Sequence, residues 1–174
     1  MVEPIAREVI PYLAEKIDAD GGTSVIYWAC GDKGDQIEEM GDLTADQARS
    51  ASYAGPQNWG EHTHLLPALR YFVERFADAE WGFYVFVTDG RLDDLEAVKN
   101  YTADLSRRVA AGTAKPIKCV LIGVGEHVDE AQMEQLDDLP DALGAGGGHM
   151  GPQDRLQCVI YGTSSPRWWM KTRW

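Results

Sequence analysis

Residues 81–91, which read W-G-F-Y-V-F-V-T-D-G-R, constrain the fold of this chain more than any other segment. Residues 83–88 are aromatic or β-branched, without polar alternation. This pattern is typical of a short strand that is buried on both faces of a parallel sheet. Asp89 and Gly90 end the strand, and a helical pattern begins just after them. Ligands collect at the carboxyl ends of strands in open α/β sheets, so Asp89 is a candidate for metal binding or catalysis. The alternative interpretation is that Asp-Gly only forms a turn.

Helical and strand patterns alternate along the rest of the chain. Helices are predicted at residues 5–17, 65–76, 92–111 and 130–139, with a bend at Pro11 because proline has no N–H to donate. Asp129 and Gln132 resemble a capping box at the start of the last helix. Further strands are predicted at residues 24–30, 36–43, 117–124 and 156–161, and residues 46–60 are expected to form a long loop. This order predicts an α/β domain with a mainly parallel sheet flanked by helices.

The two ends of the chain depart from this pattern. A parallel sheet of right-handed strand–helix–strand units normally begins with a strand, yet the first predicted element is a helix, so we expect a strand that precedes Met1. At the other end, only Asp154 of the 28 acidic residues lies beyond Leu143, and three of the six tryptophans lie there. We therefore divide the chain into an α/β domain at residues 1–143 and a Gly-rich loop with a basic, Trp-rich tail at residues 144–174.

The net charge and the cysteines indicate which kinds of binding partner and which cellular compartment to expect. The formal charge of 16 − 28 = −12 repels phosphate backbones and anionic lipids, so neither nucleic acid nor a membrane is the expected partner. Cys30, Cys119 and Cys158 are odd in number, widely spaced and set in apolar surroundings, which indicates buried thiols in a reducing compartment. No signal-peptide pattern or membrane-spanning apolar run is found, so the expected location is the cytoplasm.

Several motifs, in this order and spacing, resemble a von Willebrand factor type A (VWA) domain of the bacterial intracellular kind. They are S-V-I-Y-W-A-C at residues 24–30 after the first helix, G-E-H-T at residues 60–63, V-T-D-G at residues 87–90, and I-K-C-V-L-I-G-V-G from residue 117. The resemblance covers roughly residues 2–140. It implies a doubly wound, Rossmann-like sheet whose first, central strand lies before Met1.

The resemblance also implies a metal-ion-dependent adhesion site (MIDAS) that holds Mg²⁺ at the carboxyl edge of the sheet. By this resemblance, Thr63 and Asp89 are metal ligands. A hard cation such as Mg²⁺ prefers oxygen ligands and retains waters. In this family a carboxylate of a partner protein completes the shell, which gives binding without catalysis. The family's Asp-x-Ser-x-Ser loop is absent from this sequence, and it belongs just before Met1.

The tail also departs from the family, whose members end in an acidic helix. Met150-Gly151 must be encoded by ATG-GG, which contains the Trp codon TGG in a shifted frame. We therefore hypothesise that the chain after about Gly146 is a frameshifted translation. The coding DNA tests this hypothesis.

The residues leave alternatives open. Thr63 suits a helix N-cap as well as a metal ligand, and Asp93 and Asp94 suit either a helix start or the rim of the site. The leading hypothesis is a non-enzymatic, Mg²⁺-dependent protein-binding domain. One alternative is a Mg²⁺-dependent hydrolase that uses Asp89 with His62 or His64 as base. The other is a non-functional truncated gene product, in which buried strands lack a neighbour unless another segment or an oligomer supplies it.

Overall fold

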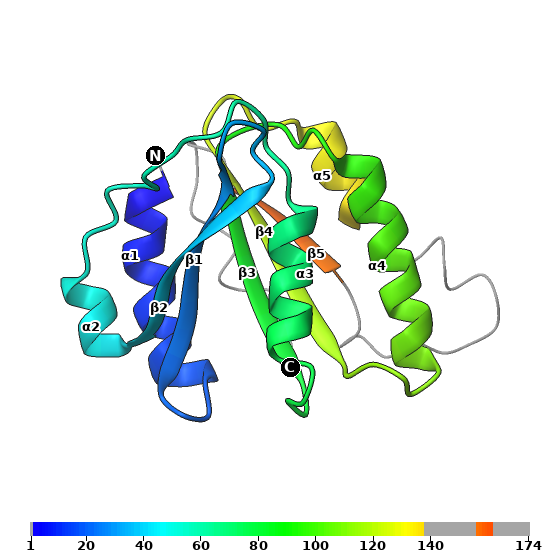
Figure 1. The fold of residues 1–174 in the computed structure, drawn as a ribbon, viewed down its shortest axis with the longest axis horizontal. Coiled ribbons are helices and arrows are strands. Elements are labelled where there is room, and N and C mark those ends of the chain that lie inside the picture. The colour runs from blue at the N-terminus through cyan, green and yellow to red at the C-terminus, as the bar shows by residue number, and fades with distance from the viewer. Residues whose placement is uncertain (1, 138–155, 162–174) are drawn as a thin grey trace.

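The computed structural model describes residues 2–137 and the backbone of residues 156–161. Its α-helices are α1 (Val2–Tyr12), α2 (Ala45–Ser50), α3 (Leu66–Arg75), α4 (Leu95–Ala110) and α5 (Glu130–Asp137), and a π-helical turn, η1 (Leu13–Ile17), follows α1. Its strands are β1 (Gly22–Cys30), β2 (Gln36–Thr44), β3 (Gly82–Thr88), β4 (Ile117–Val124) and β5 (Leu156–Tyr161) (Figure 1). The predicted mixed α/β class is therefore confirmed.

The strands form two sheets. β1 and β2 pair antiparallel, whereas β3, β4 and β5 form a parallel sheet in that order. Within the described residues, β1 and β3 are not hydrogen-bonded to each other. The described strands thus do not form the single, doubly wound sheet that the resemblance implies.

The main core lies on one face of the parallel sheet. Tyr84 and Phe86 of β3 belong to a buried cluster with Leu69 and Phe72 of α3 and Leu121 of β4. The Phe72 and Tyr84 rings stack with their centroids 5.3 Å apart, and the Tyr84 hydroxyl donates to the Phe72 carbonyl. The helix predicted at residues 65–76 therefore packs on the sheet through Leu69 and Phe72, whose side chains are removed from water.

The other face of β3 differs from the prediction. Burial alternates strictly along the strand, so that Phe83, Val85 and Val87 are only half-buried while their neighbours are buried. The prediction of burial on both faces is therefore wrong for this structure. The uniform aromatic and β-branched composition concealed the difference between the two faces.

Two segments near the start of the chain differ from the predicted secondary structure. The α-helix ends just after Pro11, where a bend was predicted, and the wider turn η1 follows it. The predicted loop at residues 46–60 instead begins with α2. Thr44 and Gln47 form a complete capping box there, with each side chain bonded to the other residue's N–H.

The predicted tail lies almost wholly outside the described residues. Residues 156–161 do form the predicted strand, and β5 pairs with β4 from Cys119↔Leu156 to Val124↔Tyr161. The shifted-frame hypothesis and the boundary at residue 143 stay predictions. Cys30 and Cys119 are buried, as predicted, while the Cys158 side chain lies outside the described part of the chain.

Candidate functional site

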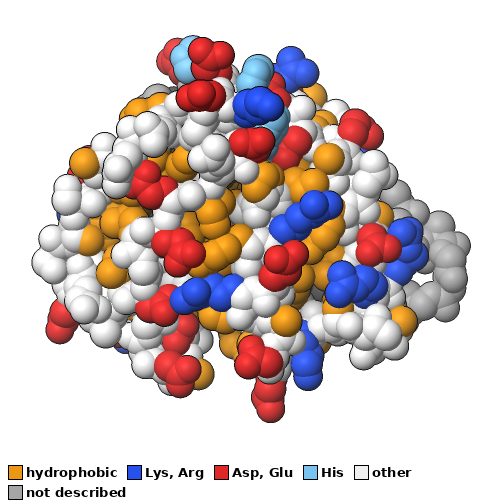
Figure 2. Space-filling model, viewed as in Figure 1, with side chains coloured by type: hydrophobic (Ala, Val, Ile, Leu, Met, Phe, Trp, Pro, Cys, Tyr) orange, Lys and Arg blue, Asp and Glu red, His pale blue; other side chains and the backbone are white. Residues whose placement is uncertain are grey.

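Three loops meet at the edge where β1 and β3 end. The turn after β1 is joined to residues 58–64 by backbone hydrogen bonds from Gly31 N–H to the Asn58 carbonyl and from His64 N–H to the Gly34 carbonyl. Gly34 has a φ of 64° and touches the His62 backbone so closely that a Cβ would overlap it, hence only glycine fits. Figure 2 shows acidic and histidine side chains gathered at this upper edge.

Thr63 and Asp93 join the loop at residues 58–64 to the third loop, which is the turn between β3 and α4. The Thr63 N–H donates to the Asp93 carboxylate at 2.9 Å, and the Asp93 N–H donates to the Thr63 carbonyl at 3.0 Å. The Thr63 N–H bond lowers the pKa of Asp93, helped by the nearby His62, although partial desolvation opposes the shift. This reciprocal pair fixes the position of Thr63 relative to the turn that follows β3.

Asp94 caps a helix that is distant in sequence. Its carboxylate accepts the N–H groups of Leu65 and Leu66 at 3.0 and 2.8 Å, at the start of α3. It makes no side-chain capping bond to its own helix, α4. The interpretation of Thr63 as an N-cap is therefore wrong, because Leu65 occupies that position. Of the two roles weighed for Asp93 and Asp94, Asp94 does stabilise a helix start, but that of α3 rather than of α4. Asp93 instead pairs with Thr63.

Gln132 is a residue of the site that the sequence analysis misplaced. Its side-chain amide is buried and binds Leu92 twice, accepting from the Leu92 N–H and donating to the Leu92 carbonyl, both at 2.9 Å. The predicted capping box is thus only half formed. Asp129 accepts from the Gln132 N–H, but the Gln132 side chain holds the β3–α4 turn instead of returning to Asp129.

The two predicted ligands lie on adjacent loops. A Cβ added to Gly90 would be 3.8 Å from the Thr63 hydroxyl oxygen, so the hydroxyl faces the turn that Asp89 begins. Asp89 is exposed and Thr63 is half-buried. Within the described residues, neither the Asp89 carboxylate nor the Thr63 hydroxyl has a hydrogen-bond partner. Both are hard oxygen donors of the kind that Mg²⁺ prefers, so the donor set fits this cation, although it supplies only two ligands.

The hydrolase hypothesis pairs Asp89 with His62 or His64 as base, but the structure shows other contacts for both histidines. His62 and His64 stack with ring centroids 5.8 Å apart, and His62 Nδ1 lies 3.4 Å from the Asp93 carboxylate. Their contacts in the described structure are thus with each other and with Asp93 rather than with Asp89. A search of the described residues finds no group of three or more His, Cys, Asp or Glu side chains that could hold a metal ion.

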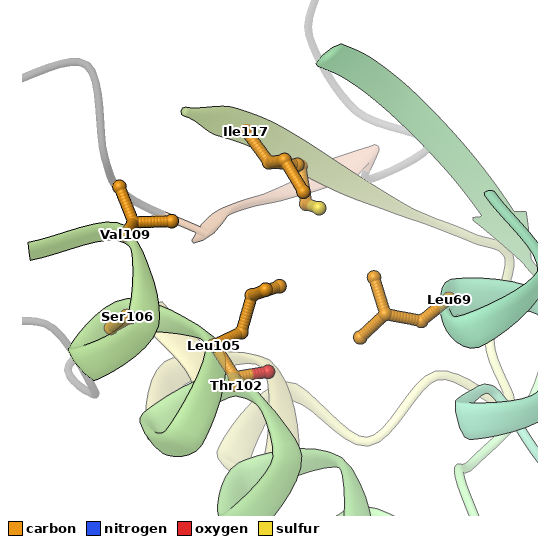
Figure 3. A pocket seen from close by; sticks show the side chains of 7 residues that line it. Leu69, Thr102, Leu105, Ser106, Val109 and Ile117 are labelled. Atoms are coloured by element: carbon orange, nitrogen blue, oxygen red, sulfur yellow. The ribbon is translucent and has the colours of Figure 1, made fainter. Parts of the chain in front are cut away.

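A second feature is a small cavity far from this edge (Figure 3). Its volume is about 30 Å³, and its lining comes from α3, α4 and β4: Leu69, Thr102, Leu105, Ser106, Val109, Ile117 and Cys119. The hydroxyl of Thr102 is buried without a hydrogen-bond partner among the residues that the structure describes. Such a volume holds at most one water, and the lining offers it few polar partners, so the cavity is a packing defect rather than a ligand site.

Comparisons with known proteins leave the resemblance untested. Neither the family models, nor the curated proteins, nor the solved structures gave a match. None of the helices in residues 2–137 is both long and apolar enough to cross a membrane.

Proposed function

We propose that this chain is a protein-binding domain of the VWA type, which contacts its partner through the edge that carries Thr63 and Asp89. The observation that carries the proposal is that the Thr63 hydroxyl faces the turn that Asp89 begins. Among the described residues, neither the Thr63 hydroxyl nor the Asp89 carboxylate has a hydrogen-bond partner. No acid–base pair or nucleophile is required, and the proposed activity is binding without catalysis. In the proposed fold, β1–β2 and β3–β4–β5 are the two halves of one doubly wound sheet.

The proposed cation is Mg²⁺. Thr63 would supply a neutral hydroxyl and Asp89 a carboxylate, and waters would fill the remaining positions, as is common for this ion. Bound there, the cation would supply positive charge for a carboxylate of the partner protein. The hydrogen bonds of Asp93 and Asp94 support this arrangement, because they position the Thr63 loop without using either proposed ligand.

A mixed surface beside the edge is suited to contact with a protein. An open hollow follows the exposed side of α3, lined by His64, Leu66, Pro67, Arg70, Tyr71, Glu74 and Asp94. It combines apolar and aromatic side chains with charges of both signs. Recognition surfaces on proteins typically have this composition, with aromatic residues and arginine enriched.

Direct binding of Mn²⁺, a paramagnetic substitute for Mg²⁺, tests the proposal. Electron paramagnetic resonance measures the free ion during titration of the wild-type chain and of the variants Asp89→Asn and Thr63→Val. With two protein ligands we expect a Kd on the order of 10⁻³ M, comparable to the weakest natural divalent sites. Each variant should weaken binding by at least about tenfold, the equivalent of one lost charge-assisted contact.

Asp20→Asn is the matched control. Asp20 is an exposed acidic residue at the opposite, amino end of β1, so its neutralisation changes the net charge without touching the edge. Equal binding by the wild-type chain and by Asp89→Asn would refute the metal site. Mn²⁺ binding that responds equally to Asp20→Asn would identify general attraction to an acidic protein.

A further inference from the structure

Trp59 is an exposed aromatic residue at the carboxyl edge. It is 74% exposed, and its backbone forms a β-bridge with Cys30 at the carboxyl end of β1. Thr63 follows four residues later in the same loop, and four residues of chain span at most about 14 Å. A stable protein interface covers about 800 Å² on each partner, a patch roughly 30 Å across. One partner protein can therefore contact both Trp59 and the proposed cation site.

Hydrogen bonds fix the backbone on either side of Trp59 to the end of β1. The Gly31 N–H donates to the Asn58 carbonyl at 3.0 Å, and the Gly60 N–H donates to the Ala29 carbonyl at 3.2 Å. Ala29 has a φ of 59°, a left-handed conformation that residues other than glycine seldom adopt. Such a conformation persists only where the surrounding structure holds it. The end of β1 is thus shaped to hold the segment that presents Trp59.

The Trp59 ring lies against the backbone of its own loop. It touches Gly55, which has a φ of 99°, so closely that a Cβ there would overlap the ring, and only glycine fits. The loop is held in turn by the Gly55 N–H, which donates to the Tyr27 hydroxyl at 3.3 Å, and by the Gln57 N–H, which donates to the Glu38 carboxylate at 2.9 Å. An aromatic side chain on an ordered loop loses little entropy on binding, as is typical of interface anchors.

The charges near Trp59 indicate the chemistry of the partner. The turn after β1 and the segment at residues 55–61 carry mainly acidic side chains, together with one residue of β2: Asp32, Lys33, Asp35, Glu38 and Glu61. None of them forms an ion pair with another described residue. An exposed indole face attracts a cation, and carboxylates around it add to this attraction. Arginine suits the place better than lysine, because its planar guanidinium stacks on the ring while its N–H groups bind carboxylates.

We propose that Trp59 anchors the partner protein, which places an arginine side chain over the indole ring. The guanidinium stacks on the ring, and its N–H groups bind the carboxylates around Trp59. This inference rests on the proposed function, because it gives the same partner a second contact at the same edge. The contact involves no metal ion, so it is measured separately from the cation site.

Random heptapeptides displayed on phage test the proposal. The wild-type chain selects from the library in the presence of EDTA, so that no divalent cation takes part. We expect arginine to be enriched in the selected sequences. One selected peptide is then synthesised with its arginine, with lysine, or with citrulline, which keeps the planar shape but has no charge. Binding followed by fluorescence anisotropy should be at least about fivefold weaker for the citrulline peptide, because the cation is lost.

Two matched variants locate the contact. Trp59→Ala and Trp81→Ala each remove an exposed indole, and Trp81, which is 55% exposed, precedes β3 at the opposite end of the sheet. We expect the affinity for the arginine peptide to fall by at least about tenfold for Trp59→Ala only, as for the loss of an interface anchor. Circular dichroism confirms that each variant is folded. The citrulline peptide tests the same contact in the unaltered chain.

Several results would overturn the proposal. Equal affinity for the arginine and lysine peptides would identify general attraction to an acidic protein, and equal affinity for the citrulline peptide would identify apolar binding alone. Equal binding by Trp59→Ala and Trp81→Ala, or a library that yields no binding peptide, would refute the anchor. A dimer of the chain in sedimentation that Trp59→Ala abolishes would identify a second copy as the occupant instead. Mn²⁺ binding without peptide binding would refute this inference alone, and peptide binding without Mn²⁺ binding would refute the cation site alone.

Discussion

Replacing Gln132 offers the sharpest test of how the β3–α4 turn is held. Gln132 and Leu92 are both almost fully buried and exchange two hydrogen bonds. Gln132→Met keeps much of the side-chain volume but leaves the Leu92 N–H and carbonyl without partners. A buried unpaired group costs roughly 1–3 kcal/mol, so we expect a loss of about 2–4 kcal/mol after partial relaxation. For a chain of this size that loss lowers the Tm by about 5–15 °C.

Gln132→Glu distinguishes the hydrogen bond that the Gln132 side chain accepts from the one that it donates. The new carboxylate still accepts from the Leu92 N–H, but it faces the Leu92 carbonyl, which repels it. Burial and this repulsion raise the pKa of the carboxyl above the unfolded value of about 4.3. The neutral acid donates to the carbonyl, so its contribution to stability is complete below that unfolded pKa and is lost as the pH rises through the folded pKa. The variant should therefore approach wild-type stability only in acid.

Thermal and urea unfolding followed by circular dichroism between pH 4 and pH 8 measures these effects. Gln135→Glu is the matched control, because Gln135 is an exposed glutamine on the same helix. A Gln132→Met variant within about 0.5 kcal/mol of the wild type, the usual range for surface changes, would refute the assigned role. So would a Gln132→Glu variant whose deficit relative to the wild type is the same at every pH.

Two further predictions concern Thr102 and Asp93. Thr102→Val should stabilise the chain by about 1 kcal/mol in urea unfolding, because it removes a buried hydroxyl that has no partner in the described part of the chain. Thr113→Val should give no such gain, because the Thr113 hydroxyl donates to the Arg108 carbonyl. The pKa of Asp93 lies below its usual value of 3.8, so its carboxylate adds stability above that pH and loses it as the pH falls through the folded pKa. The Tm difference between the wild type and Asp93→Asn should therefore shrink below about pH 4, and a constant difference would contradict the assigned pairing.

The sequence predicts what depends on local pattern and misses what depends on distant partners. The bounds of β4 and β5 follow from their apolar runs, and α2 could have been predicted from Thr44 and Gln47, whose spacing is that of a capping box. In contrast, Gln132 binds a residue 40 positions away, and Asp94 caps a helix that precedes it by 28 residues. No periodicity encodes such pairs, because only the tertiary fold brings the partners together.

Hydrogen bonds at the carboxyl edge already hold the two loops that carry the proposed cation ligands. Asp93 and Asp94 position the Thr63 loop, and Gln132 positions the turn after Asp89. Since these bonds involve neither the Thr63 hydroxyl nor the Asp89 carboxylate, both loops are ordered before any ion arrives. An ion therefore does not have to offset the entropy of ordering two loops, which otherwise reduces the net free energy of binding. At the proposed cation site, the small number of protein ligands, rather than the mobility of the loops, would therefore limit the affinity.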